Sequence, residues 1–206
     1  MGRPTKGSKR RRTRKCKVLE QLTPEEGAGV LRSLLEHHPE LVSEAENMAR
    51  ATVTDVDPDA VAEDIEQVVS DLDSEELNAR TRRKSWGYVE PIEAAWEILE
   101  ESVEPFLEKM RRHIALGFEA AAVATCAGIV LGLYRCRGKG SDQLLGWAED
   151  FPAEAAGNAV ATLTRESKVK HKSCWRLPDS AVAQVPKWAD IIGRASKPVS
   201  PAAGRR

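Results

Sequence analysis

Residues 91–134, PIEAAWEILEESVEPFLEKMRRHIALGFEAAAVATCAGIVLGLY, contain the strongest helical patterns in the chain. Apolar side chains recur every three or four residues from position 92 to position 114, which places them on one face of an α-helix. Pro105 lies inside this pattern and, because it has no N–H, we expect it to kink the helix or restart it. After Gly117 a second helix is expected over residues 118–134. This pair predicts an all-α fold.

Residues 120–134 contain no charged side chain and combine small residues with bulky ones. The small residues fall four apart and predict a helix-packing seam, along which another helix approaches closely. The seam consists of Ala120, Ala124, Gly128 and Gly132. The uncharged stretch is too short to span a bilayer unaided. We therefore expect a buried central helix and no membrane association.

Three helices are predicted before residue 73 from the residues at which they begin. Residues 23–26, Thr-Pro-Glu-Glu, have the pattern of a capping box and precede an apolar stripe that ends before Pro39. A second helix follows Pro39, and residues 57–58, Asp-Pro, begin a third. Because the connections are short, neighbouring helices are expected to be antiparallel.

The chain after residue 137 predicts a loop, one more helix and a tail. The helix is expected over about 153–165, and residues 166–206 are polar with several prolines and one short amphipathic stretch. The predicted organisation is a basic disordered arm at 1–19, a helical domain at 20–165 and a mostly flexible tail at 166–206. The fold class is all-α, either an irregular helical-hairpin bundle or a short α-solenoid, with disordered termini.

Charge is divided into blocks along the 206 residues, although the net charge is −1. Residues 1–17 carry a net charge of +9, residues 18–78 carry −15 and residues 79–206 carry +5. Because unpaired charges are costly to bury, we expect the first block to be disordered and open to polyanions. The candidate nucleic-acid contacts in this arm are Arg10, Arg11, Arg12, Arg14 and Lys15. The alternatives are a solubilising tail and a contact with the acidic block that follows.

A second candidate for nucleic-acid contact is the basic and aromatic connector at residues 80–89. Arg82 and Arg83 lie near Trp86 in the sequence and combine positive charge with a flat ring that can stack on nucleobases. In the alternative interpretation, Trp86 and Tyr88 fill the hydrophobic core and the basic residues face water or the acidic helices. Both interpretations stay open.

The sequence contains no recognisable catalytic or metal-binding pattern. Residues 138–141, Gly-Lys-Gly-Ser, depart from the spacing of a phosphate-binding loop. The four cysteines include no Cys-x-x-Cys pair, and His171 with Cys174 forms only half of a metal site. We therefore expect no metal, no cofactor and no enzyme activity.

Histidines and paired acids receive structural interpretations. His113 ends a helix with two arginines before it, so we interpret it as a cation that suits the helix dipole. Glu100 and Glu101 are adjacent and point to different faces, so we interpret them as solvated surface. Cys126 lies within an apolar helix and is expected to be a small buried side chain.

Residues 85–106 and 117–134 resemble functionally uncharacterised bacterial all-helical proteins. Residues 116–121 are also similar to the turn inside tetratricopeptide repeats, although the chain has no 34-residue period. The resemblance transfers no catalytic residue. The −15 segment on amphipathic helices and the lack of a recognisable catalytic pattern lead us to expect an interaction or adaptor protein without catalytic activity, whose partner is another protein. Cysteines without a disulfide framework fit a cytoplasmic location. The alternative is a nucleic-acid-associated protein that binds RNA or DNA through the basic N-terminal arm.

Overall fold

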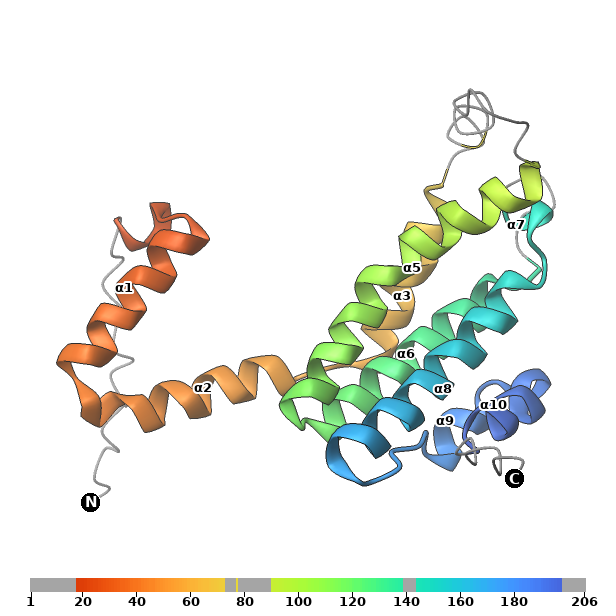
Figure 1. Ribbon diagram of the computed structural model, residues 1–206. Helices are drawn as coiled ribbons and strands as arrows, with labels where there is room; N and C mark the ends of the chain where they lie inside the picture. Colours follow the sequence, from red (N-terminus) through yellow and green to blue (C-terminus); the bar gives the residue numbers. More distant parts are fainter. Residues whose placement is uncertain (1–17, 73–76, 78–89, 139–143, 198–206) are drawn as a thin grey trace, which may run out of the picture. The chain divides into compact units, whose positions relative to one another are not determined.

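The computed structural model describes residues 18–72, 77, 90–138 and 144–197, and all regular structure in these residues is helical. The prediction of an all-α fold is confirmed. The chain forms two compact units, Met1–Arg50 and Ala51–Arg206, and the division falls inside a helix (Figure 1).

The first unit contains the 3₁₀ turn η1 (Leu19–Gln21), helix α1 (Pro24–His37), the turn η2 (Pro39–Leu41) and the start of α2 (Val42–Thr54). The predicted capping box is confirmed. The Thr23 N–H donates to Glu26 Oε2 at 2.9 Å, and the Glu26 N–H donates to Thr23 Oγ1 at 3.3 Å. These two bonds satisfy backbone donors that a helix start otherwise leaves free.

The apolar stripe of α1 is not buried within this unit. Val30, Leu31 and Leu34 are 45–50% exposed, and none of the described residues up to Arg50 is buried. Helix α1 therefore gains its order from its caps and backbone bonds more than from packing inside the unit.

The second unit is built around α6 (Glu119–Cys136), which contacts α3 (Pro58–Ser70), α5 (Pro91–Leu116) and α8 (Phe151–His171). The short helices α7 (Leu144–Trp147), α9 (Asp179–Ala183) and α10 (Ala189–Ala195) and the 3₁₀ turn η3 (Pro186–Trp188) complete it. Of the described helices, α6 alone is long and apolar enough to cross a membrane by length and composition, and 67% of it is buried inside the protein.

Helix α5 is continuous through Pro105, so the predicted restart does not occur. Pro105 is exposed, and its ring is accommodated on the solvent side of the helix. The helix ends at Gly117, whose φ of +76° lies in the left-handed region that favours glycine. The N–H of Phe118 donates to the His113 carbonyl at 3.0 Å, which closes the turn into α6.

The small-residue seam of α6 is divided between two surroundings. A Cβ added at Gly128 would lie 2.6 Å from Val61 Cβ, and one added at Gly132 would lie 2.8 Å from the Ala62 carbonyl oxygen, so α3 packs directly on these glycines. Ala124 is half-buried and Ala120 is exposed, and both line a shallow hollow next to α9.

Arg135 of α6 adds a polar link to the same helix pair. Its guanidinium donates to Asp59 Oδ1 at 2.6 Å and to Glu66 Oε1 at 3.3 Å. Burial lowers the pKa of Arg135, but the bonds to the two carboxylates raise this pKa by more. The link between α3 and α6 is therefore charged throughout the ordinary pH range.

The flexible tail predicted from residue 166 differs from the structure. Helix α8 continues to His171, and Trp175, Val185, Trp188 and Ile192 are all buried. The Trp175 N–H donates to Ser167 Oγ at 3.0 Å, which turns the chain back onto α8. Val185, Trp188 and Ile192 belong to the short amphipathic stretch that the sequence showed. Trp175 lies outside that stretch, so the sequence pattern did not reveal its burial.

Candidate functional site

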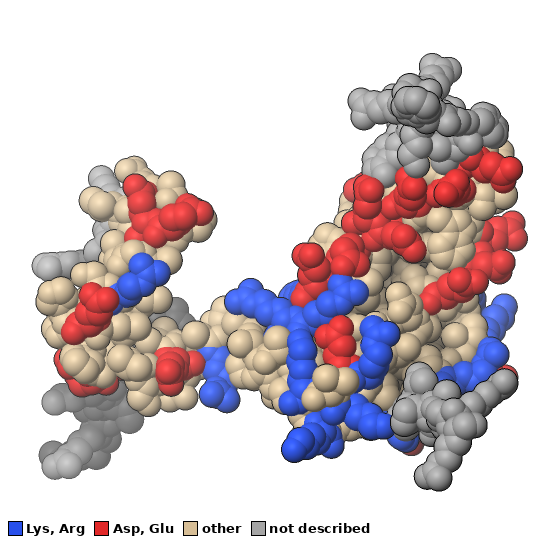
Figure 2. All heavy atoms as spheres, in the orientation of Figure 1, with Lys and Arg blue, Asp and Glu red and all other residues tan. Residues whose placement is uncertain are grey.

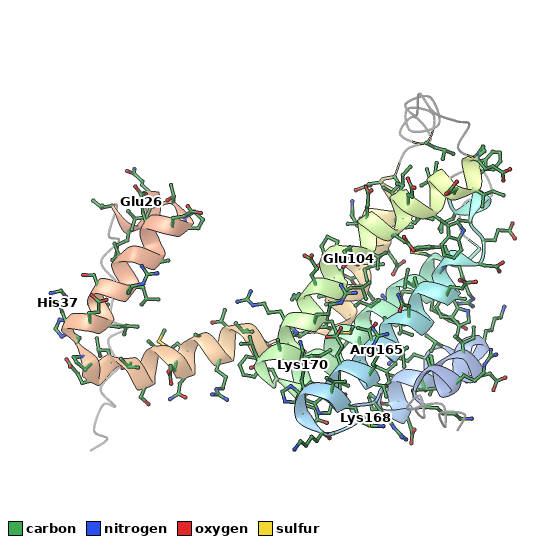
Figure 3. All side chains as sticks on the ribbon, viewed as in Figure 1. Glu26, His37, Glu104, Arg165, Lys168 and Lys170 are labelled. Carbon is green, nitrogen blue, oxygen red and sulfur yellow. The ribbon has the colours of Figure 1, made fainter. Side chains whose placement is uncertain are left out.

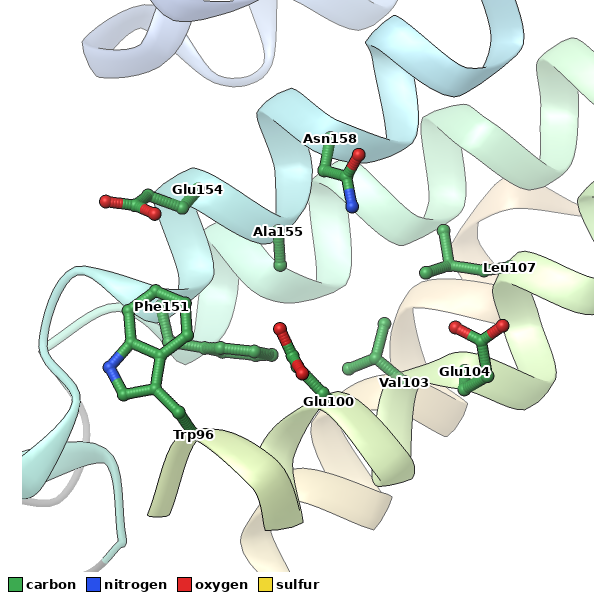
Figure 4. Close-up of a pocket in the computed structure, with 9 residues that line it drawn as sticks. All are labelled: Trp96, Glu100, Val103, Glu104, Leu107, Phe151, Glu154, Ala155 and Asn158. Atoms are coloured by element: carbon green, nitrogen blue, oxygen red, sulfur yellow. The ribbon is translucent and has the colours of Figure 1, made fainter. Parts of the chain in front are cut away.

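A groove of about 380 Å³ lies between α5 and α8 (Figure 4). Its apolar lining comes from Val103 and Leu107 of α5 and from Phe151 and Ala155 of α8. The indole of Trp96 meets the Phe151 ring edge to face, with 5.2 Å between the ring centroids. This aromatic pair closes one end of the groove.

The groove exists because α5 and α8 are parallel neighbours. The Trp96–Phe151 contact joins their N-terminal ends. At the other end, His171 Nε2–H donates to the Ile114 carbonyl oxygen at 2.5 Å. Each half of α5 therefore lies beside the corresponding half of α8, and side chains with the same position along the two helices come together.

The N-terminal halves of both helices are acidic. Residues 91–104 contain five acidic residues and no basic one, and residues 149–158 contain three acidic residues and no basic one. Glu100 points into the space between the helices, and Glu154 lies at its rim (Figure 4). Within the described part of the chain, neither of these two carboxylates forms an ion pair. The groove thus presents free negative charge above an apolar floor.

A chain of ion pairs runs from the middle of α5 to the C-terminal end of α8. Arg111 of α5 pairs with Glu104 on its own helix and, at 3.8 Å, with Glu166 of α8. Lys170 reaches the second oxygen of Glu166 at 3.8 Å. The charged side chains in these partly exposed pairs neutralise each other, and each pair contributes at most about 1 kcal/mol to stability.

The C-terminal halves of the two helices are basic. Residues 165–172 contain four basic side chains and one acid, and Arg165, Lys168 and Lys170 project from the C-terminal part of α8 (Figure 3). Figure 2 shows the result as acidic atoms over one end of this face and basic atoms over the other. Val169, an apolar residue among these lysines, is 77% exposed. The α5/α8 face is therefore divided into an acidic half and a basic half.

His113 is not the helix-end cation that we expected from the sequence. It is 2% exposed, its Nδ1–H donates to Thr125 Oγ1 at 3.1 Å, and the Thr125 hydroxyl donates to the Ala121 carbonyl at 2.8 Å. Burial lowers the pKa of His113, and the positive charge of Lys109 lowers this pKa further. His113 is thus a neutral link between α5 and α6.

Two other side chains that could take part in catalysis or metal binding, His171 and Cys126, also make structural contacts. The ring of His171 stacks on Trp175 with 4.8 Å between centroids. Cys126 is buried as expected, and burial raises the pKa of its thiol to about 12. Within the described ranges, no group of three or more His, Cys, Asp or Glu side chains is placed to hold a metal ion.

The predicted nucleic-acid contacts lie outside the described residues. They are Arg10, Arg11, Arg12, Arg14, Lys15, Arg82, Arg83 and Trp86. The alternative role of Trp86 and Tyr88 as core residues falls in the same undescribed segment.

Sequence reasoning missed the groove because its two walls are about fifty positions apart. Glu100 is exposed, as expected from the sequence, and it also lines the groove, which the sequence did not indicate. One signal was present: Trp96, Glu100 and Glu104 are spaced by four and place an aromatic ring and two acids on one edge of α5. Comparisons of the chain with protein-family models, with curated proteins and with solved structures gave no match.

Proposed function

We propose that this protein is a non-catalytic interaction protein that holds a basic, amphipathic helix of a partner in the groove between α5 and α8. The observation that carries the proposal is the combination of an open apolar floor with the carboxylates of Glu100 and Glu154, which have no ion-pair partner among the described residues. A helix that lays apolar residues into a groove and pairs its charges with the rim is a common mode of peptide recognition.

The chemistry of the lining supports binding more than catalysis. It consists of apolar and aromatic side chains, three glutamates and the amide of Asn158. The lining contains no histidine, cysteine, serine or lysine, so it has no activated nucleophile next to a base. Its acids attract lysine or arginine, and its floor selects an apolar side chain beside them.

A direct test uses a labelled helical peptide that carries leucine and lysine on one face. We expect saturable binding by fluorescence anisotropy, with an affinity that falls as salt rises. The Glu100→Lys, Glu154→Lys double variant should weaken binding at least tenfold. The matched control is Glu63→Lys with Asp64→Lys on α3, which makes the same charge change at exposed positions outside the groove.

Two results would contradict the proposal. One is no binding to the wild-type protein. The other is an equal loss in the groove variant and the α3 control, because that would show attraction by overall charge with no role for the groove.

The net charge of +9 over residues 1–17 supports a second candidate function, binding to RNA or DNA through this arm. Deletion of residues 1–17 should then abolish retention of nucleic acid, while the deletion should leave peptide binding in the groove unchanged. Retention that survives the deletion would eliminate the arm as the contact.

A further inference from the structure

One exposed stripe of α8 carries acidic residues at its N-terminal end and basic residues at its C-terminal end. The stripe begins at the N-cap, and its residues follow one another at intervals of three or four positions, which keeps them on one face of the helix. Its members are Asp150, Glu154, Asn158, Ala161, Arg165 and Lys168. All of them are exposed except Ala161, which is half-buried. The stripe therefore runs from two acids through two uncharged residues to two bases.

Two copies of such a stripe complement each other when they lie antiparallel. Glu154 of one copy then faces Arg165 of the other, and Asp150 faces Lys168. Asn158 faces Ala161 at the centre, where short side chains allow the two helices to approach closely. The three pairs share a midpoint near residues 159–160, so a single twofold axis satisfies all of them, as an isologous interface requires.

The same arrangement supplies an apolar occupant for the groove. Val169 lies about one position farther beyond the midpoint than Phe151 lies before it, and helical spacing puts both on the groove side of the stripe. Val169 of one copy therefore faces the Trp96–Phe151 end of the other copy's groove. This accounts for an apolar side chain that is 77% exposed among lysines, in a protein whose groove offers an apolar floor.

The charges that this pairing uses are the ones that each chain leaves free. Glu104, Arg111, Glu166 and Lys170 form ion pairs within one chain. In the described part of the chain, Glu154, Arg165 and Lys168 form none. Figures 2 and 3 show that the acidic and basic halves lie on one face, so both can meet a single partner surface.

We infer that the α5/α8 face pairs with a second copy of this chain, so that the acidic half of each copy contacts the basic half of the other and Val169 enters the opposite groove. The inference rests on the proposed function, because it names the occupant of the same groove. Steering by complementary charge sets the antiparallel register, and burial of the apolar groove supplies the favourable free energy.

The test measures the mass of the full-length protein by sedimentation velocity and light scattering at several concentrations and salt levels. The wild-type protein should sediment at twice the chain mass of 22.7 kDa in low salt and dissociate as salt rises. The variant Asp150→Lys, Glu154→Lys and the variant Arg165→Glu, Lys168→Glu should each be monomeric. Asp150 makes no side-chain cap hydrogen bond, so its replacement removes no cap from α8.

Mixing the two charge-reversal variants is the decisive experiment, because a variant that has lost only its pairing can form a dimer with the other, whereas a misfolded one cannot. A one-to-one mixture of the two monomeric variants should restore a dimer that contains one chain of each kind. The variant that carries all four changes should again form a homodimer. Glu63→Lys with Asp64→Lys should remain dimeric, and Val169→Asp should raise the dissociation constant at least tenfold.

Failure of this inference is distinguishable from failure of the proposed function. The helical peptide is added to the Arg165→Glu, Lys168→Glu variant, whose groove is intact and free. A monomeric wild-type protein together with peptide binding by this variant would overturn the dimer and leave the docking groove standing. A monomeric wild-type protein together with no peptide binding would overturn the dimer and the docking groove. The same conclusion would follow if the one-to-one mixture of the two variants stayed monomeric and bound no peptide.

Discussion

Two helix pairs of the second unit, α3 with α6 and α5 with α8, are closed to different degrees. At Gly128 and Gly132 the backbone of α3 is so close that α6 has no room for a Cβ. Between α5 and α8, the rings of Trp96 and Phe151 occupy the contact and leave a groove of about 380 Å³ beside them. Side-chain volume at a helix contact therefore decides whether the contact only stabilises the fold or also leaves room for a partner.

The largest expected effect is at the aromatic end of the groove. Phe151 is 1% exposed, so Phe151→Ala removes a packed ring and should lower the free energy of unfolding by about 3–5 kcal/mol. Trp147 is 52% exposed, so Trp147→Ala should lower the free energy of unfolding by clearly less than Phe151→Ala does. Urea unfolding followed by circular dichroism measures both. Similar losses in the two variants would mean that the groove end is not part of the core.

The closed pair is tested by adding one methyl group. Gly128→Ala places a Cβ against Val61 and the Pro58 carbonyl oxygen, and this overpacking should lower stability by about 1–3 kcal/mol. Gly193 of α10 has nothing within 4 Å of such a Cβ, so Gly193→Ala should raise stability by up to about 1 kcal/mol. The two melting temperatures should therefore shift in opposite directions. A rise in both would show that α3 and α6 are not in close contact.

The charged link across the closed pair should have a smaller effect. Arg135→Gln breaks the bonds to Asp59 and Glu66 and should lower stability by up to about 1 kcal/mol in low salt. The difference should diminish in 1 M NaCl, because the pair is partly exposed to screening ions. Arg176→Gln, at an exposed arginine outside these contacts, makes the same charge change and serves as the control. An effect of Arg135→Gln that does not depend on salt would contradict an electrostatic origin.

The smallest effect concerns His113, which joins α5 to the helix that both pairs depend on. Its pKa is lower in the folded protein than the ordinary value of 6.5, so the unfolded chain binds a proton more readily. Proton binding by His113 therefore makes no contribution to stability well above pH 6.5, and it reduces stability as the pH falls below this value. The slope of stability against pH between 7.5 and 5 should be smaller in His113→Gln. An unchanged slope would show that another group carries the pH dependence.

The parts of the fold that local chemistry determines could be predicted from the sequence. The bonds at Thr23 and Glu26 and the turn at Gly117 depend on residues within a few positions of one another. The spacing of glycines in α6 indicated a close helix contact, and α3 lies on two of them. The sequence did not indicate which helix would be the neighbour.

The groove and the packed C-terminal segment could not be predicted because both depend on distant residues. Glu100 becomes part of a groove only when α8 lies parallel to α5, and nothing near Glu100 in the sequence specifies that direction. Trp188 belongs to an amphipathic stretch that the sequence showed, but its contact with Tyr134 joins residues more than fifty positions apart. Trp175 lies outside any such stretch and stacks on His171. His113 was misinterpreted for the same reason, since its hydrogen-bond partner Thr125 lies on the next helix.

The central position of α6 has a consequence for how the protein is made. Helices α3 and α5 leave the ribosome before α6, whereas α8 follows it in the chain. At common rates of translation, synthesis of the residues from Arg137 to His171 takes roughly 2–7 s, so α8 leaves the ribosome after α6 by a similar interval. Until α8 docks, the side of α6 that α8 covers in the folded protein stays open, and α6 is the described helix most apolar along its length.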